Sequence, residues 1–573
     1  MDNSPSLGAH ECSDKCPATP GPAEPDPPRN AVRFPKWQLV AVFGFLIPSL
    51  VWILSDRRVW PWDQAWYGEV SVELWFKFTH HIGSWIPGML GAFGSKAPGV
   101  AFLGQLFVPI GRLFGSIEPA LLLSVLTAQA GTLSLIYRIG KRFSPERFSV
   151  ALAGVAVAAA APLFVALSHQ YVAEPLQLFG VAYFYFLAAC SDTMRRETLI
   201  GHLLIATSTA MLAKVTSPLY CAFPGFLALA TLIGKFRGKR PPSEGCLHWK
   251  SGLFMTGVIL SLLCVIWYIR NFHLVLDFVR LASSSEIALQ YGSRGTFQKK
   301  LITWLNASQT SLAFPAILAA IGLVLIAAVG IFLVRHRGRV SSRTSRLDLL
   351  AVASLLHILA VLAVFSMNIN EETRYLLPLL PAVATILMWS LTQIRVPAIA
   401  MMTAGMLVVQ WGFVCSQALG ITARNPKLSY WLLPVNRDRQ QMDEITAVIQ
   451  ATSQPKDSGR YNISGVEIPW LNANSLAFYS AKAQLKSKHR CYYTSLGYAA
   501  QDIESAWTRM NAMNSLYFVS LSEAVSPEKP DFLNQLSIPV LHRIQRDPSF
   551  VPQAFESNLG ILIYRREGKP AIH

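Results

Sequence analysis

Long apolar stretches without charged side chains dominate this chain. The segment 311–334 contains no acidic or basic residue, and about 20 consecutive apolar residues are enough to cross a bilayer as a helix. Such a pattern predicts a polytopic α-helical membrane protein with about 12–13 spans. The other apolar segments lie at 37–54, 98–115, 119–137, 149–167, 172–190, 200–213, 217–234, 252–269, 348–367, 375–392 and 396–416.

The composition excludes the soluble classes of protein. Of 573 residues, 52% are hydrophobic and 14% are charged, whereas soluble domains carry about 25% charged residues. The 50 basic residues outnumber the 33 acidic ones, but they stand mostly in short loops between apolar segments, where they set membrane topology. We therefore expect no nucleic acid as a partner.

Clusters of basic residues predict which loops are cytoplasmic. These clusters lie at 29–36, 138–147, 195–196, 235–240 and 335–346. The opposite, exoplasmic face then receives 168–174, 214–217, 271–310, 368–374 and 417–573. The segment 56–97 should also be exoplasmic, and this leaves the loop 138–147 on the wrong side. Either one crossing between 56 and 172 is missed, or one apolar segment there is re-entrant.

Three regions follow from these patterns. Residues 1–35 are predicted to be a disordered cytoplasmic tail, and 36–416 a membrane domain. Within that domain, five tryptophans in 56–97 favour short helices along the membrane surface. Residues 417–573 are predicted to be an exoplasmic α/β domain. Its expected helices are 440–452, 471–483 and 500–513, and its expected strands are 466–468, 491–494, 515–519 and 561–564.

Ionisable side chains gather where the predicted spans reach the exoplasmic face. Each of these acids and lysines has a purely structural explanation as well as a functional one. An acid near an aromatic belt is often only a loop residue, a lysine at a helix entrance can extend to the interface, and an acid beside a proline suits a helix N-terminus. An exoplasmic arginine, however, opposes the usual inside bias. The candidate site residues are Asp63, Tyr67, Glu69, Lys96, Glu174, Arg270, Arg374 and Tyr375.

One membrane face with several acids and cations suits the transfer of a group from an anionic lipid to a polar acceptor. Cations would hold the phosphate leaving group, and a carboxylate would take the proton of the acceptor. Lys96 can act as a point charge on phosphate, and Arg374 can grip phosphate through two parallel hydrogen bonds.

The order of motifs along 37–392 resembles the lipid-linked-sugar glycosyltransferases of the GT-C class. The nearest branch holds the lipid A aminoarabinose transferase and the protein O-mannosyltransferases. Two residues depart from it: Gln64 replaces a second acid, and Ser95 stands where the aminoarabinose branch has an acid, which argues against that substrate. The motifs are Asp63-Gln-Ala-Trp-Tyr67, Lys96-Ala-Pro98, Glu174-Pro-Leu176, Leu212-Ala-Lys-Val-Thr-Ser-Pro218, Trp267-Tyr-Ile-Arg-Asn271 and Arg374-Tyr-Leu-Leu-Pro-Leu-Leu-Pro381.

The resemblance implies a polyprenyl-phosphate sugar donor and transfer on the exoplasmic side, with inversion at the anomeric carbon. Asp63 would be the general base, and Lys96, Arg374 and Tyr375 would hold the donor phosphate, with Arg270 as a weaker candidate. Glu174 would line the cavity. Tyr67 and Glu69 complete the predicted substrate-binding set. Whether the sugar is a hexose or a pentose stays open.

Other aspects of the function stay open at this stage. No cofactor is certain, and a divalent metal is an open alternative. The acceptor is a lipid, a glycan or a protein, and we expect location in a bacterial inner membrane. A transporter or flippase of a lipid-linked or polyanionic substrate is the main alternative, although no internal repeat of the transporter type is visible. A membrane anchor that presents 417–573 leaves the motif series unexplained.

Overall fold

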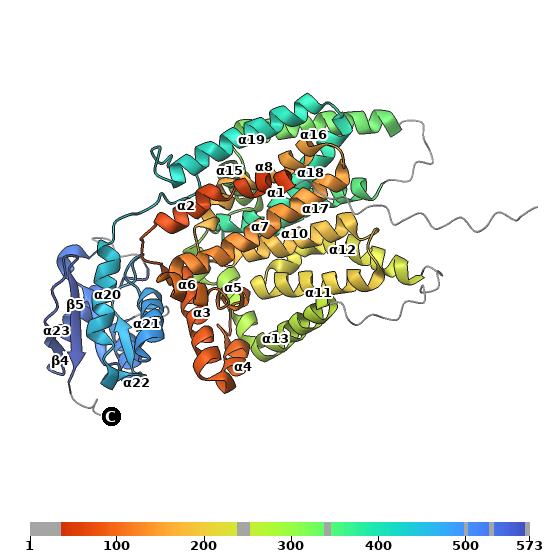
Figure 1. The fold of residues 1–573 in the computed structure, drawn as a ribbon. Coiled ribbons are helices and arrows are strands. Elements are labelled where there is room, and N and C mark those ends of the chain that lie inside the picture. The colour runs from red at the N-terminus through yellow and green to blue at the C-terminus, as the bar shows by residue number, and fades with distance from the viewer. Residues whose placement is uncertain (1–35, 238–251, 337–344, 498–501, 527–531, 568–573) are drawn as a thin grey trace, which may run out of the picture. The chain divides into compact units, whose positions relative to one another are not determined.

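The computed structural model describes residues 36–237, 252–336, 345–497, 502–526 and 532–567. The predicted disordered tail 1–35, and parts of the two basic clusters after 234 and after 334, lie outside these residues. Figure 1 shows that helices form most of the described chain and that the strands gather in its C-terminal part.

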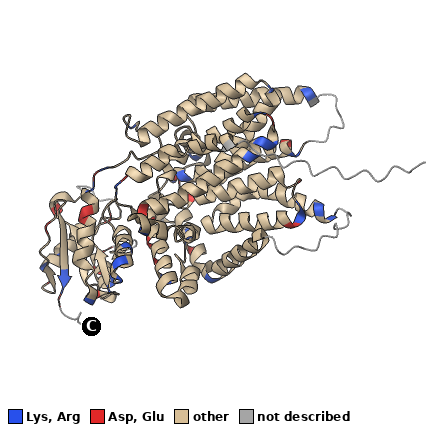
Figure 2. Cartoon of the chain, in the orientation of Figure 1, with Lys and Arg blue, Asp and Glu red and all other residues tan. Residues whose placement is uncertain are grey.

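Seven described segments are long and apolar enough to cross a membrane, which makes this an integral, multi-pass membrane protein. An eighth forms if α8 (Phe148–Ala159) and α9 (Pro162–Ser168), which meet at 64°, are one broken span. Figure 2 shows that the middles of these helices carry little charge. The seven are α7 (Ile117–Phe143), α12 (Ser217–Arg237), α13 (Gly252–Ser284), α16 (Pro315–His336, of which Pro315–Arg335 is the apolar part), α17 (Arg346–Ser366), Thr373–Ile394 (η1 and α18) and α19 (Pro397–Ala418).

This number is smaller than the 12–13 spans expected from hydropathy, because several apolar segments are broken or short. Segment 37–54 divides into α1 (Lys36–Gly44) and α2 (Ile47–Ser55), and 98–115 divides into α5 (Gly99–Gly104) and α6 (Val108–Phe114). Helices α2 and α6 each have proline in the first turn, where the missing N–H favours a new helix start. Segments 172–190 and 200–213 correspond to α10 (Glu174–Cys190) and α11 (Arg196–Ala213).

Two segments that were expected to be exoplasmic loops, 56–97 and 271–310, are largely helical. The tryptophan-rich segment 56–97 forms α3 (Trp62–His80) and α4 (Ile82–Gly91). The predicted loop 271–310 is largely helical, because α13 continues to Ser284 and is followed by α14 (Glu286–Leu289) and α15 (Phe297–Ser311). The bent pair of α8 and α9 falls within 56–172, where the charge pattern requires a missed crossing or a re-entrant segment.

The C-terminal part contains a five-stranded sheet in the order β2-β1-β3-β5-β4. Strand β1 is parallel to β2 and β3, whereas β5 is antiparallel to β3 and β4. The strands are β1 (Tyr461–Ser464), β2 (Tyr492–Ser495), β3 (Tyr517–Leu521), β4 (Phe550–Pro552) and β5 (Ile561–Arg566), and the helices are α20 (Gln440–Thr452), α21 (Ala473–Ser487), α22 (Ile503–Ala512) and α23 (Ser537–Arg546).

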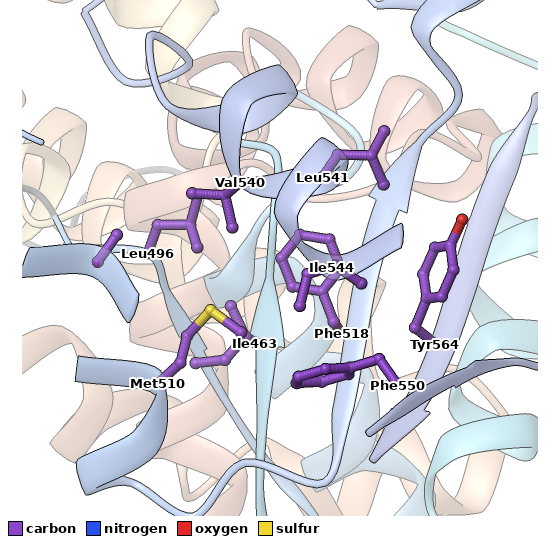
Figure 3. Packing of buried hydrophobic residues seen from close by; sticks show 10 residues of the cluster. Ile463, Leu496, Met510, Phe518, Val540, Leu541, Ile544, Phe550 and Tyr564 are labelled. Atoms are coloured by element: carbon purple, nitrogen blue, oxygen red, sulfur yellow. The ribbon is translucent and has the colours of Figure 1, made fainter. Parts of the chain in front are cut away.

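The helices and strands predicted for 417–573 can be compared with the hydrophobic packing of helices on this sheet. Figure 3 shows Met510 of α22 and Ile544 of α23 packed with Ile463 and Phe518 of the sheet. Three predicted helices and three predicted strands are confirmed, but 466–468 is not a strand. The true strand β1 carries the buried polar side chain of Asn462, whose amide contacts Thr452 and Tyr517, so it lacks an apolar signal.

Candidate functional site

Asp63 lies in the first turn of α3 and contacts two cations from distant parts of the chain. Its Oδ1 accepts a hydrogen bond from Lys96 Nζ at 2.7 Å, and its Oδ2 lies 3.4 Å from Arg374 Nη1. Burial alone would raise the pKa of this carboxyl group, but the charges of Lys96 and Arg374 hold its pKa well below the usual range. Asp63 is therefore ionised at neutral pH.

Arg374 connects Asp63 to two further carboxylates. Its Nε lies 2.6 Å from Glu372 Oε2 and 3.2 Å from Glu174 Oε1. Glu174 Oε1 also accepts a hydrogen bond from Lys214 Nζ at 2.6 Å. Three cations thus meet three carboxylates, and the six formal charges cancel. This group (Asp63, Lys96, Glu174, Lys214, Glu372 and Arg374) is called the ion-pair cluster below.

Side-chain exposure shows which member of the ion-pair cluster a ligand can reach most easily. The Asp63 side chain is 31% exposed, whereas that of Glu174 is 2% exposed. Arg374 and Lys96 lie between them at 15% and 17%. A substrate can therefore approach the Asp63–Lys96–Arg374 edge, while Glu174 is positioned to hold the cations from behind.

Aromatic side chains cover all three cations of the cluster. Lys96 Nζ lies 4.7 Å from the centre of the Trp66 ring, and Lys214 Nζ lies 4.2 Å from the Tyr375 ring. The guanidinium of Arg374 lies 5.2 Å from the Trp431 ring. These contacts fix the cations in place and reduce the water around them, which strengthens their attraction for an anion.

The structure brings together most of the site residues predicted from sequence. Asp63, Lys96, Glu174 and Arg374 belong to the ion-pair cluster, and Tyr375 packs against its Lys214. Tyr67 is buried one helical turn after Asp63 and packs edge-on against Phe93 at 5.0 Å.

Two predicted residues lie elsewhere. Glu69 pairs with Arg490 of the C-terminal domain. Arg270 is exposed on α13, and its neighbours Trp267 and Asn271 provide the buried contacts of that turn. In these two segments, therefore, the predicted charged residue lies away from the ion-pair cluster.

The prediction from sequence missed three participants. Lys214 and Glu372 stand inside motifs or next to them, so their segments carried a signal. Trp431 follows α19, outside the apolar helices, and only the tertiary structure places it over Arg374. Within the described ranges, no group of three His, Cys, Asp or Glu residues could hold a metal ion.

A close contact between α5 and the end of α11 positions two of the cations. Gly99, three residues after Lys96, lies so near α11 that an added Cβ would stand 2.6 Å from the Leu212 carbonyl oxygen, two residues before Lys214. We expect Gly99→Ala to push these segments apart and to cost about 1–3 kcal/mol in stability. Thermal melting measures this loss. Gly91→Ala, where an added Cβ meets nothing within 4 Å, is the matched control, and equal melting of both variants would contradict the contact.

Glu69 belongs to a separate cluster that joins α3 to the C-terminal domain. Arg490, whose side chain is 3% exposed, binds Glu69 and lies 3.3 Å from Glu73. Burial, with a contribution from the Glu73 charge, raises the pKa of Glu69 to about 7 despite the opposing effect of Arg490. Burial would also raise the pKa of Glu73, but Arg490 and Lys77 lower it below its usual value.

This arrangement predicts a pH-dependent stability. Between the usual pKa of 4.5 and about 7, the folded chain holds a proton on Glu69 that the unfolded chain has lost, so the Glu69 contribution falls as pH rises through that window. We expect the free energy of unfolding of Glu69→Gln to rise by about 2–3 kcal/mol relative to that of wild type between about pH 5 and about pH 8. Melting of both proteins across this range measures the difference. A constant difference would contradict the assigned pKa.

The comparisons with known proteins identify the fold. No family model and no curated relative matches the chain. Among solved structures, ArnT from Cupriavidus metallidurans in the apo state matches with a TM-score of 0.52 and 13% identity, over 92% of this chain and 97% of that one. ArnT bound to undecaprenyl phosphate gives a TM-score of 0.50 and 13% identity, over 92% and 98% of the two chains.

A second protein shows the same likeness. The arabinofuranosyltransferase AftD from mycobacteria matches with a TM-score of 0.50 and 12% identity, over 93% of this chain but 40% of that longer one. The likeness extends over nearly the whole chain, including the C-terminal domain. The chain therefore shares the fold of ArnT and AftD.

Proposed function

We propose that this chain is an integral-membrane glycosyltransferase that moves a sugar from a polyprenyl-phosphate donor to an acceptor hydroxyl group. The ion-pair cluster is the observation that carries the proposal, because it places a partly exposed carboxylate directly between two cations. The fold supports the same class, since ArnT, a structure of similar fold, was solved with undecaprenyl phosphate.

The donor phosphate would bind to Lys96 and Arg374. A guanidinium can form two parallel hydrogen bonds with phosphate, and the ammonium group adds a point charge. Tyr375 belongs to the same donor-binding set. Because Glu174 is 2% exposed and contacts Lys214 and Arg374, its proposed role is to hold these cations toward the donor.

Donor binding would also prepare Asp63 for proton transfer. In the free protein Lys96 and Arg374 lower the pKa of Asp63, and this makes the carboxylate a weak base. The donor phosphate is a diester with one negative charge. On the same two cations, that charge would partly offset theirs and raise the basicity of Asp63. Donor binding and base activation are therefore coupled, with Tyr67 one turn away on α3.

The reaction would then be a single displacement. Asp63 takes the proton of the acceptor hydroxyl, and the acceptor oxygen bonds to the anomeric carbon as the bond from that carbon to the phosphate oxygen breaks. The electron pair of the broken bond leaves with the polyprenyl phosphate, whose negative charge Lys96 and Arg374 stabilise. Attack opposite the leaving group inverts the anomeric carbon. We place this reaction on the exoplasmic side of a bacterial inner membrane.

Release of the lipid product tests the proposed function. The purified chain in nanodiscs is incubated with polyprenyl-phosphate hexoses and pentoses, together with extracted envelope lipids, glycans and proteins as acceptors. Mass spectrometry measures free polyprenyl phosphate. We expect release from one class of donor in the presence of one class of acceptor. No release from any donor, together with movement of the intact donor across liposome membranes, would favour a transporter instead.

A further inference from the structure

A cavity of about 590 Å³ lies apart from the ion-pair cluster, where α2, α6 and α7 meet α20 and α21. Figure 1 shows these elements where the apolar helices adjoin the C-terminal domain. The first two turns of α7, a membrane-spanning helix, form one wall, and the residues just after α2 form another. The cavity therefore opens at the ends of apolar helices, at the level where lipid head groups lie.

The charges that line the cavity are predominantly positive. Its two acids are already paired, because Asp56 Oδ1 accepts from Arg58 Nε at 3.3 Å and Glu118 Oε1 accepts from Lys482 Nζ at 2.6 Å. Two further arginines line it, so the walls hold four cations and two acids. The surplus of positive charge favours an anionic ligand.

The two additional arginines, Arg57 and Arg439, are the ones available to such a ligand. Arg57 Nη1 donates to the backbone carbonyls of Leu54 and Asp56 at 3.1 and 3.0 Å. Within the described residues, no carboxylate lies within 4.0 Å of the Arg57 guanidinium, and the nearest to that of Arg439 is Asp443 at 4.0 Å. Guanidinium groups without a firm carboxylate partner are suited to phosphate.

The cavity also has an apolar side that continues onto the surface. Leu54 and Phe114 line it and are themselves 56% and 78% exposed, and Leu113 beside them is 79% exposed. A free anion would gain nothing from this apolar surface, whereas an acyl chain would bury it. The ligand that matches both sides is an amphiphile with a negative head group.

We infer that this cavity binds the phosphate-bearing head group of an anionic membrane lipid, with its acyl chains along the exposed side chains of α2 and α6. This lipid site is distinct from the donor site at Asp63. Trp60 lines the cavity, and its ring stacks on Tyr171 and Phe478. These aromatic rings stand at the side of the cavity where the chain continues from Trp60 to Asp63. The inference does not depend on the proposed glycosyltransferase activity.

Photolabelling tests the lipid site in the full-length chain. The probe is phosphatidylglycerol with a photoreactive acyl chain, incorporated into phosphatidylcholine nanodiscs, and the labelled peptides are identified by mass spectrometry. The measured quantity is the ratio of labelling at 47–58 and 106–123, beside the cavity, to labelling of α16. Helix α16 serves as the reference because its exposed Leu323 and Ile326 report ordinary lipid contact. We expect Arg57→Gln/Arg439→Gln to lower this ratio about tenfold.

A matched variant and two competitors distinguish the lipid site from general attraction of anions to a basic surface. Arg437→Gln/Arg460→Gln removes the same charge from exposed arginines outside the cavity and should leave the ratio unchanged. Unlabelled phosphatidylglycerol should compete, and phosphatidylcholine should not. An unchanged ratio in the cavity variant, or equal labelling by a phosphatidylcholine probe, would overturn the inference. Competition by inorganic phosphate as strong as that by phosphatidylglycerol would indicate a plain anion site and would also overturn it.

Discussion

Asp63→Asn is expected to lower sugar transfer by about 10²–10⁴-fold, the range usual for loss of a general base. Asparagine keeps the size of the side chain but cannot take the acceptor proton. The substitution also removes a negative charge beside Lys96 and Arg374, so donor binding should be unchanged or tighter. Product formation and binding of a labelled polyprenyl-phosphate sugar measure the two effects separately.

The matched control for this prediction is Asp443→Asn, because Asp443 lies on α20 and its side chain is 66% exposed. It should retain full transfer. Retention of more than about a tenth of the wild-type rate by Asp63→Asn would remove Asp63 from the role of general base. Loss of donor binding in this variant would instead indicate that Asp63 has a structural role in the ion-pair cluster.

Arg374→Ala is expected to have the second large effect. The guanidinium contacts Asp63, Glu174 and Glu372, so its loss leaves three carboxylates with less compensation and costs about 3–5 kcal/mol in stability. Loss of its hydrogen bonds to phosphate should weaken donor binding about 100-fold, and acceptor binding should change much less. Thermal melting and titration with each substrate measure these effects.

A conservative variant keeps this second prediction testable if Arg374→Ala does not fold. Arg374→Lys retains the charge that balances the carboxylates but loses the planar, two-pronged geometry. It should melt near the wild-type temperature and still bind the donor weakly. If either Arg374→Ala or Arg374→Lys weakened acceptor binding more than donor binding, this would count against the assignment of Arg374 to the donor phosphate.

The composition and motif order were sufficient to predict the class of fold and most of the ion-pair cluster. The reason is that spans in a bilayer must be apolar, so any charge at their ends stands out: Lys96, Glu174 and Arg374 were visible in this way. Hydropathy alone does not show where a proline or a broken turn divides an apolar run, as between α1 and α2. For this reason seven described segments qualify as spans by length and composition, where about 12–13 were expected.

The remaining parts of the candidate site depend on long-range packing. Sequence alone does not indicate which side of a helix faces the neighbours. Arg270 was therefore a candidate, although a weaker one than Arg374, and it is exposed on α13. Glu69 lies less than two turns after Asp63 on the same helix, yet it points toward Arg490, more than 400 residues later. Trp431 reaches Arg374 from the segment after α19, which lies outside the motif series at 37–392.

The position of a bound lipid phosphate tests the central claim most directly. A structure of the full-length chain with undecaprenyl phosphate, determined by electron cryomicroscopy in nanodiscs, would show it. We predict phosphate density within hydrogen-bond distance of Lys96 and Arg374, with the Lys96–Asp63 contact lengthened from its 2.7 Å. Phosphate density elsewhere, for example at Arg57 and Arg439, with the Lys96–Asp63 pair intact, would contradict the assignment of the ion-pair cluster as the donor site.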